Sequence, residues 1–268
     1  MAVCPSTPGR AVDTVASAPR KGPELVPCLL IRRGEVCLPG PDGPVPARRA
    51  SGGEFDIFDI IDRLSPNFPR LYFVDLDGLE RNDPQLDYVQ ELSRDMPLWV
   101  DSGVRKSDQA IDVLVAGAQK AVLSSSYLRG PKELRRAWKL STELVFEVET
   151  MDGRLEKVDP SWETTDLPEI VRIAREVGLG EIVLSPRETE PDWALIAAIS
   201  AGGPTWVDGT FRPNDVSRLG PAGAAGGIFH IDTILAEMDS KLSSGRPTER
   251  DGTATRDDEN QNQLNHDE

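Results

Sequence analysis

Acidic side chains stand where several short apolar segments of this chain end. They are Asp75, Asp77, Asp101, Glu149 and Asp208, and a histidine, His230, ends one further segment. Carboxylates that crowd together raise one another's pKa, which is one way in which a general acid and a general base arise side by side. Such a cluster can also bind a divalent cation through its oxygens, or attract an amine-bearing substrate. Three kinds of chemistry therefore stay open.

We expect three of these side chains to transfer protons: Glu149, His230 and Asp75. We expect a second set to contact a small-molecule substrate: Asp77, Asp101, Gly103, Arg105, Ser124, Ser125, Asp208 and Gly209. The alternative for the four aspartates is structural, because each can cap the helix that follows, and Asp101 and Asp208 can pair with Arg105 and Arg212. His230 is either an acid/base or a hydrogen-bonded structural group.

Two stretches of the chain look like copies. Residues 97–105 and 204–212 carry Pro, Trp, Val, Asp and Arg at the same offsets, and each has the pattern of a buried strand, a Gly-containing turn and a helix. A self-match at about half the folded length indicates a duplicated fold. At roughly 27 residues per βα step, the copies lie four steps apart in a barrel of eight. The sequence thus predicts an α/β fold, a (β/α)8 TIM barrel built from two half-barrels.

The other elements must fit this barrel. We expect its strands at 25–31, 71–78, the first copy, 121–126, 144–149, 181–185, the second copy and 227–231. A hairpin return at 36–38 and a Gly/Pro-rich loop at 39–53 should lie over the catalytic face, which in this fold is formed by the carboxyl ends of the strands. The predicted domains are a disordered arm (1–22), the barrel (23–242) and a disordered acidic tail (243–268).

Composition narrows the range of partners. The chain carries 30 Lys and Arg against 45 Asp and Glu, a net charge of -15, whereas nucleic-acid and anionic-membrane surfaces need clustered basic residues. Three cysteines without a CxxC motif fit a reducing cytoplasm, and no apolar run is long enough to span a membrane. We expect a soluble cytoplasmic protein that acts on a small molecule without a cofactor, a divalent cation being the alternative. The sequence does not define its oligomeric state.

Several of these segments resemble the HisA/HisF family of histidine biosynthesis. Residues 25–36 resemble the strand "IPAIDL" and its return "DGKVV", 74–77 resemble "VDLD", and 101–105 resemble "GGGIR", which precedes a helix and a strand similar to "VLGT". The resemblance covers roughly residues 25–240 and is to the HisA branch, which isomerises an aminoaldose to an aminoketose in phosphoribosylformimino-AICAR ribotide. It implies a TIM barrel and an isomerase, with Glu149 at a catalytic position.

The sequence departs from that family at its functional positions. Leu30 stands where the resemblance places the first catalytic aspartate, and Glu149 replaces the second. The Gly-rich phosphate turns are replaced by Asp101-Ser102-Gly103, Ser124-Ser125, Asp208-Gly209-Thr210 and His230-Ile231-Asp232. Two like charges about 4 Å apart repel by about 4 kcal/mol at an effective dielectric of 20. We therefore expect weakened binding of a bis-phosphorylated substrate, although the turn at 124–126 can still hold one small anion.

These observations predict a divergent isomerase or lyase that uses carboxylate and histidine acid–base catalysis on a small biosynthetic metabolite. One alternative is a non-catalytic binding or assembly protein that kept the barrel. Another is a divalent-metal-dependent aldolase or hydrolase, which needs three or four carboxylates within coordination distance of one ion. Acidic side chains gathered at the barrel mouth favour the enzyme, and acidic side chains scattered among salt bridges favour the binding protein.

Overall fold

The computed structural model describes residues 22–151, 154–155, 159–186, 191–208 and 216–244. The predicted terminal arm and acidic tail lie outside these ranges, apart from Gly22 and the last residues of a helix that ends at Ser244. The predictions of disorder for the two termini therefore stay predictions.

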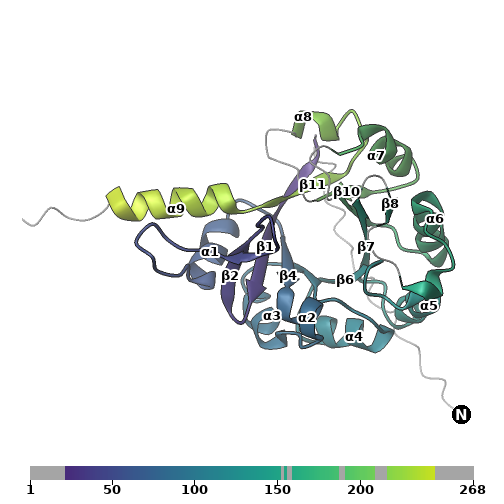
Figure 1. Ribbon diagram of the computed structural model, residues 1–268, viewed down its shortest axis with the longest axis horizontal. Coiled ribbons are helices and arrows are strands. Elements are labelled where there is room, and N and C mark those ends of the chain that lie inside the picture. The colour runs from purple at the N-terminus through teal and green to yellow at the C-terminus, as the bar shows by residue number, and fades with distance from the viewer. Residues whose placement is uncertain (1–21, 152–153, 156–158, 187–190, 209–215, 245–268) are drawn as a thin grey trace, which may run out of the picture.

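Eight parallel strands form a closed barrel (Figure 1). In order around the barrel they are β1 (Glu24–Arg32), β4 (Leu71–Asp75), β5 (Leu98–Asp101), β6 (Lys120–Ser124), β7 (Leu144–Met151), β9 (Ile182–Pro186), β10 (Thr205–Val207) and β11 (Gly226–His230). The last strand pairs with the first, and Cys28 lies opposite His230. The predicted (β/α)8 barrel is confirmed.

Helices surround the barrel on its outer side (Figure 1). They are α1 (Ile57–Leu64), α2 (Leu76–Arg81), α3 (Leu86–Leu92), α4 (Ser107–Val115), α5 (Gly130–Leu140), α6 (Leu167–Val177), α7 (Trp193–Ser200), α8 (Val216–Leu219) and α9 (Asp232–Ser244), with a short 3₁₀ turn at Pro160–Trp162. α9 lies beside α1, where Glu237 pairs with Arg63 at 3.7 Å. Among the described residues, we find no helix with the length and apolar character needed to cross a membrane.

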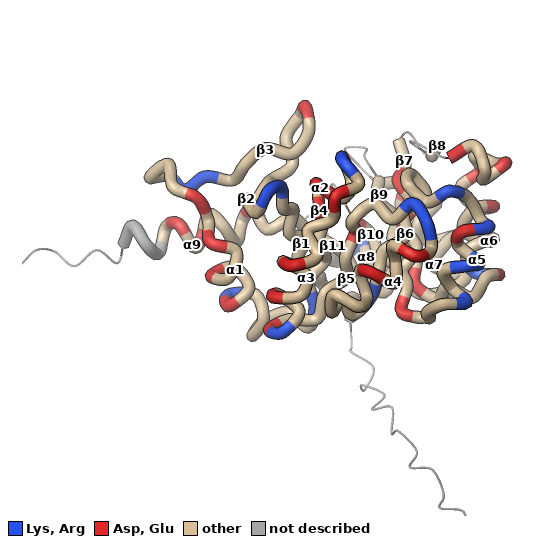
Figure 2. The backbone as a smooth tube through the Cα atoms, turned by 90° about the horizontal axis from the view of Figure 1, so that it is seen from below, with Lys and Arg blue, Asp and Glu red and all other residues tan. Residues whose placement is uncertain are grey.

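Short antiparallel strands extend the barrel at its carboxyl end. β2 (Glu35–Leu38) turns back along β1, β3 (Val45–Pro46) pairs with β2, and β8 (Arg154–Leu155) pairs with the end of β7. Figure 2 shows β3 and β8 on the same side of the barrel. The hairpin return predicted at 36–38 is confirmed, and it stands at the face where the parallel strands end.

Side chains of the strands alternate between two apolar clusters, because successive strand residues point to opposite faces. The larger cluster lies between the sheet and the helices. The smaller one fills the barrel interior with Val26, Cys28, Leu30, Tyr72, Trp99, Val122, Val145, Val183, Trp206 and Ile228. Burial on both faces explains why these strands appear in the sequence as continuous apolar runs.

An arginine and two tryptophans close the amino-terminal end of the barrel. Trp99 and Trp206 meet edge to face with their ring centroids 5.0 Å apart. The guanidinium of Arg70 lies 4.9 Å from the Trp99 ring and 5.7 Å from the Trp206 ring, and it pairs with Glu24 at 2.8 Å. We call this group the barrel floor. The two tryptophans are core residues.

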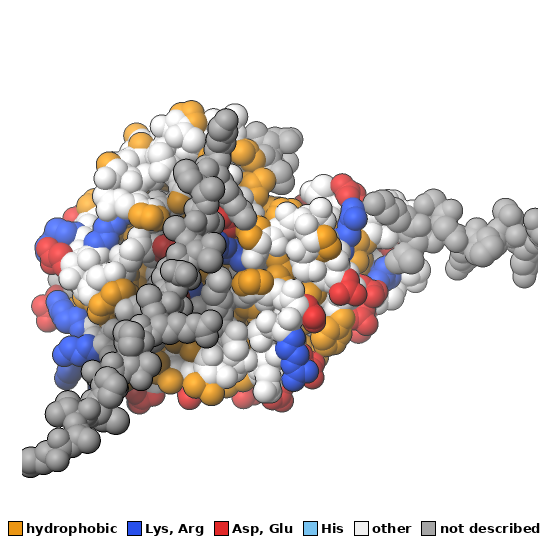
Figure 3. All heavy atoms as spheres, turned by 180° about the vertical axis from the view of Figure 1, so that it is seen from behind, with side chains coloured by type: hydrophobic (Ala, Val, Ile, Leu, Met, Phe, Trp, Pro, Cys, Tyr) orange, Lys and Arg blue, Asp and Glu red, His pale blue; other side chains and the backbone are white. Residues whose placement is uncertain are grey.

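On the outside, charge is distributed over several elements. Seen from behind, acidic and basic side chains lie interspersed with apolar ones over the visible face (Figure 3). Acidic side chains of the described residues therefore do not gather in one patch on the visible part of this face.

Candidate active site

At the carboxyl end of the barrel, most side chains on the inner face are polar instead of apolar. One step above the apolar interior, the inward positions are Leu30, Val74, Asp101, Ser124, Glu147, Ser185, Asp208 and His230, with Glu149 one step higher on β7. Leu30 and Val74 continue the apolar cluster on β1 and β4. The positions from β5 to β11 are polar. We call this polar arc the barrel mouth.

Asp101, at the end of β5, is 3% exposed. Its Oδ1 accepts a hydrogen bond from the backbone N–H of Gly103 at 3.0 Å. Burial and the nearby charge of Glu149 raise the pKa of Asp101 to about 7, although hydrogen bonds from Gly103 and the Glu147 side chain oppose this change. A carboxyl group that titrates near neutral pH can donate or accept a proton under physiological conditions.

Glu149 and Glu147 extend inward from β7, two residues apart, so both side chains point to the same face. The Oε2 of Glu149 accepts a hydrogen bond from the Ser126 hydroxyl at 2.6 Å. Both glutamates are buried, with exposed fractions of 8% and 3%. Glu149 thus faces Asp101 in a different hydrogen-bonding environment, and such a difference assigns separate acid and base roles to two carboxyl groups.

Two tyrosines adjoin the carboxylates. Tyr72 is 1% exposed, and its hydroxyl has no hydrogen-bond partner among the residues described. Burial, followed by the charges of Glu147, Asp101 and Asp208, raises its pKa well above the ordinary value. Burial and the charges of Asp101 and Glu149 also raise the pKa of Tyr127. Both hydroxyls therefore stay protonated and can donate hydrogen bonds.

Asp208 and His230 complete the mouth on β10 and β11. Asp208 Oδ2 accepts a hydrogen bond from the Ser185 hydroxyl at 3.2 Å, whereas its Oδ1 is buried and has no partner within the described part of the chain. His230 is half-buried, and its Nδ1 likewise lacks a partner there. Within the described residues, the mouth therefore contains a buried carboxylate oxygen and a buried imidazole nitrogen that lack hydrogen-bond partners.

Asp75 and Asp77 do not join this group. The sequence predicts both on one strand, but β4 ends at Asp75, whose carboxylate caps α2 by accepting from the N–H groups of Asp77 and Gly78 at 3.1 Å. It also accepts from Gln85 N–H at 2.6 Å. Asp77 accepts from Arg33 N–H at 2.6 Å and pairs with Arg81. Both carboxylates have the capping and pairing contacts of the structural alternative.

The turn after β5 is closed by its own side chains. Gly103 has a φ of +66°, and a Cβ there would lie 2.9 Å from Leu79 Cα, so the position requires glycine. Its N–H already binds Asp101. Arg105 donates to the carbonyl oxygens of Gly78 and Leu79 in α2, to Asn82 Oδ1 at the end of that helix, and to the carbonyl oxygen of Gly103 in its own turn.

Amide groups of the turn after β6 are satisfied in the same way. Ser125 N–H donates to the carbonyl of Glu147 at 2.8 Å, and Ser126 N–H donates to Ser124 Oγ at 3.2 Å. These are the N–H groups with which a turn would cradle a phosphate. The corresponding turn after β10 contains Gly209, which lies outside the described residues.

Glu147, Tyr72, Tyr127 and Ser185 are not among the predicted site residues, and Ser126 is predicted only as part of the turn at 124–126 that can hold an anion. The sequence carried one usable signal, since Glu147 precedes Glu149 by two residues and must share its face. The tyrosines and serines had no signal of their own. Within the described ranges, no group of three His, Cys, Asp or Glu side chains is arranged to hold a metal ion, so the convergence required by the metal-dependent hypothesis is not met there.

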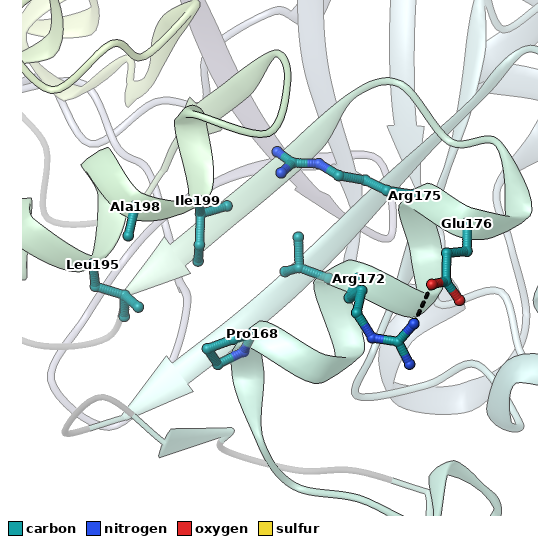
Figure 4. Close-up of a pocket in the computed structure, with 8 residues that line it drawn as sticks. Pro168, Arg172, Arg175, Glu176, Leu195, Ala198 and Ile199 are labelled. Atoms are coloured by element: carbon teal, nitrogen blue, oxygen red, sulfur yellow. Dashed lines mark hydrogen bonds and ion pairs between the residues drawn. The ribbon is translucent and has the colours of Figure 1, made fainter.

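A groove of about 420 Å³ lies elsewhere, on the outer side of the barrel between α6 and α7. Figure 4 shows Pro168 and Arg172 on one wall and Leu195 and Ile199 on the other, with Arg172 paired to Glu176. It faces away from the ends of the strands, where active sites of this fold are built. The barrel mouth is therefore the candidate active site.

Comparison with known proteins gives two kinds of match. The model of a family described as "histidine biosynthesis protein" matches residues 24–188. A 1-(5-phosphoribosyl)-5-((5-phosphoribosylamino)methylideneamino) imidazole-4-carboxamide isomerase from Methanococcus maripaludis is 25% identical over 180 residues, which are 64% of this chain and 71% of the relative. The isomerase of the same name from Parasynechococcus marenigrum is 31% identical over 90 residues, or 32% of this chain and 35% of the relative.

Proposed function

Because the chain belongs to the histidine biosynthesis protein family, we propose that it is an isomerase or lyase that transfers protons on a small biosynthetic metabolite at the barrel mouth. The observation that carries this proposal is the buried group of Asp101, Glu147 and Glu149, in which Asp101 has a pKa raised to about 7 by burial and by Glu149. Perturbed carboxyl groups at the carboxyl end of a barrel are typical of acid–base catalysis.

The roles follow from the environments of the two carboxyl groups. Glu149, held by the Ser126 hydroxyl, is the base that removes a proton from a carbon of the substrate. Asp101, partly protonated near neutral pH, is the acid that delivers a proton to the substrate atom that becomes negative. Tyr72 and Tyr127 donate hydrogen bonds to the developing charge. His230, on the opposite side of the mouth, is a second acid/base candidate.

We propose the reaction class of the two relatives, both isomerases by name, but not their substrate. Leu30 cannot exchange a proton, so the β1 side of the mouth provides no carboxyl group. The N–H groups of Gly103, Ser125 and Ser126, in the turns after β5 and β6, already donate to oxygens of the chain itself. These N–H groups are therefore not free to bind a phosphate.

The gathering of carboxylates supports an enzyme over the alternative of a binding or assembly protein. Asp75 and Asp77 hold caps and ion pairs, as in a purely structural arrangement. Asp101 and Asp208 instead lie on the inner face of the barrel, where burial of ionisable groups is costly. Such a cost is typical of catalytic sites.

A deuterium-incorporation experiment tests the proposal even though the substrate is unidentified. The full-length protein is incubated in D₂O with a small-metabolite extract, and mass spectrometry detects any metabolite that gains deuterium at carbon. We expect incorporation with the wild type and with Glu91→Gln, a matched change on the exposed side of α3. Glu149→Gln should lower the rate by a factor of about 10² to 10⁴.

Two results would count against the proposal. Absence of incorporation into every metabolite, or incorporation that persists in Glu149→Gln, would remove the proton-transfer role. Efficient isomerisation of the substrate named for the two relatives would contradict the claim of a different substrate and would assign the ordinary reaction of those relatives.

A further inference from the structure

Two aspartates occupy matching positions in the two sequence copies but differ in their hydrogen bonds. Asp101 Oδ1 accepts the N–H of its own turn, from Gly103, and the carboxyl group also interacts with the Glu147 side chain. Among the described residues, Asp208 receives one side-chain hydrogen bond, from the Ser185 hydroxyl to Oδ2 at 3.2 Å. Its Oδ1 is left without a donor in the described part of the protein, although Asp208 is only 7% exposed.

A buried carboxylate oxygen without a donor destabilises the folded protein, because this oxygen has lost its hydrogen bonds to water and has no other hydrogen bond in their place. A ligand that brings an N–H or O–H group to this oxygen recovers the lost interaction. The open acceptor therefore marks a position for a donor group of the substrate.

A second buried polar group without a hydrogen-bond partner interacts with Asp208. The Tyr72 hydroxyl is buried and has no partner among described residues. It interacts electrostatically with Asp208 as well as with Asp101 and Glu147. Tyr72 lies on β4 and Asp208 follows β10, so the two open groups approach the mouth from different sides of the barrel.

The charges around Asp208 and the Tyr72 hydroxyl determine whether a positively or a negatively charged ligand group is favoured there. The charged groups that act on the Tyr72 hydroxyl include Glu147, Asp101 and Asp208, and each of them disfavours additional negative charge there. Charges at short range interact strongly in a poorly solvated site, because little water screens them. A cationic nitrogen is stabilised at this position, and a phosphate is repelled.

The positions of the acceptor groups favour an organic cation over a metal ion as the ligand. A metal ion needs several oxygens within about 2.0–2.6 Å of one point, and no such group of side chains occurs in the described residues. An ammonium or amidinium group has several N–H donors pointing in different directions, and each reaches an acceptor at about 2.9 Å. It can therefore contact carboxylates that do not converge on one point.

We propose that the barrel mouth binds its substrate through a positively charged nitrogen group, an amine or amidine, seated against Asp208 and next to the Tyr72 hydroxyl. This inference rests on the proposed function for its location at the active site. It adds a substrate class, namely an amine-bearing metabolite whose nitrogen anchors it beside β10 while Asp101 and Glu149 act on a neighbouring carbon.

Calorimetric titration of the full-length protein tests this inference with four probes. They are 1,4-diaminobutane, its neutral analogue 1,4-butanediol, ribose 5-phosphate and inorganic phosphate. We expect the diamine to bind at least about tenfold more tightly than the diol. Asp208→Asn should weaken diamine binding about 30-fold, because it leaves the shape of the site but removes the charge that pairs with the ligand.

A matched variant and a stability measurement accompany the titration. Asp108→Asn makes the same change at an exposed position of α4 and should leave the diamine affinity unchanged. In the absence of ligand, Asp208→Asn should raise the urea midpoint, because it removes a buried charge with an open oxygen. This measurement also shows that the variant is folded.

Several outcomes would overturn the inference: equal affinity for diamine and diol, tighter binding of either phosphate probe, no effect of Asp208→Asn on diamine binding, or no binding of any probe. The titration measures binding without turnover. If deuterium incorporation persists while the diamine does not bind, the inference is wrong and the proposed function stands. If the diamine binds through Asp208 without any deuterium incorporation, the proposed function is wrong and the amine site stands.

Discussion

Replacing Asp101 by asparagine should remove a pH-dependent loss of stability. Asparagine has nearly the shape of aspartate and carries no charge, so its side-chain oxygen can still accept from Gly103 N–H. The variant therefore imitates protonated Asp101 at every pH. The wild type has this form only where its carboxyl group holds the proton.

The sign and size of the effect follow from the pKa. Burial and Glu149 raise the pKa of Asp101 from 3.8 to about 7, so the folded protein holds this proton more tightly than the unfolded chain does. The stability contributed by the proton is fully present below pH 3.8 and is lost as the pH rises to about 7. At 1.36 kcal/mol per pKa unit, the loss amounts to about 4 kcal/mol.

Urea denaturation of both proteins between about pH 4 and about pH 8 measures this loss. Because titrating groups far from Asp101 are common to both, the free energy of unfolding of Asp101→Asn minus that of the wild type measures Asp101 together with the carboxyl groups that interact with it. We expect this difference to grow with pH and to level off above about pH 7, and Asp108→Asn should show a flat difference. A flat difference for Asp101→Asn, or one that shrinks with pH, would refute the reasoning and would indicate a positive charge next to Asp101.

Two further predictions concern the barrel that holds the site. Gly226→Ala should lower the free energy of unfolding by about 3 kcal/mol, because a Cβ there collides with the Glu24 carbonyl and the Trp206 ring where β11 closes the barrel. Gly180→Ala is the control, because a Cβ at that position meets no atom within 4 Å. Equal urea midpoints for the two variants would contradict this account. Asp75→Ala should lower the free energy of unfolding by about 3 kcal/mol, because it leaves buried N–H groups unpaired. Asp192→Ala, at an exposed helix cap, should lower it by about 1 kcal/mol. Similar losses for the two variants in thermal denaturation would count against a buried capping role of Asp75.

The barrel could be predicted because its strands are buried on both faces and appear as short apolar runs at regular spacing. Residues 121–126 and 181–185, for example, overlap β6 and β9. The helix α2 could not be predicted in this way. The segment 74–78 directly follows the apolar run 71–73 and resembles its continuation, but the capping contacts of Asp75 with Gly78 and Gln85 begin a helix there.

The site could be predicted only in part, because the direction of each side chain depends on strand register. Asp101 lies opposite Val74, and Val74 lies opposite Leu30, so these three share the inner face. Asp75 is one residue further along and therefore points away from it. The sequence shows carboxylates at the ends of both strands, but it does not show this difference of one residue. Pairing of strands far apart in the sequence decides it.

The barrel floor has a consequence for kinetics. Arg70, Trp99 and Trp206 pack across the amino-terminal end, so these side chains fill the barrel interior at that end. In the proposed function, the substrate therefore binds at the other end, where the polar groups of the barrel mouth lie. Substrate and product of the proposed reaction then occupy the same site, and the product should act as a competitive inhibitor with respect to the substrate.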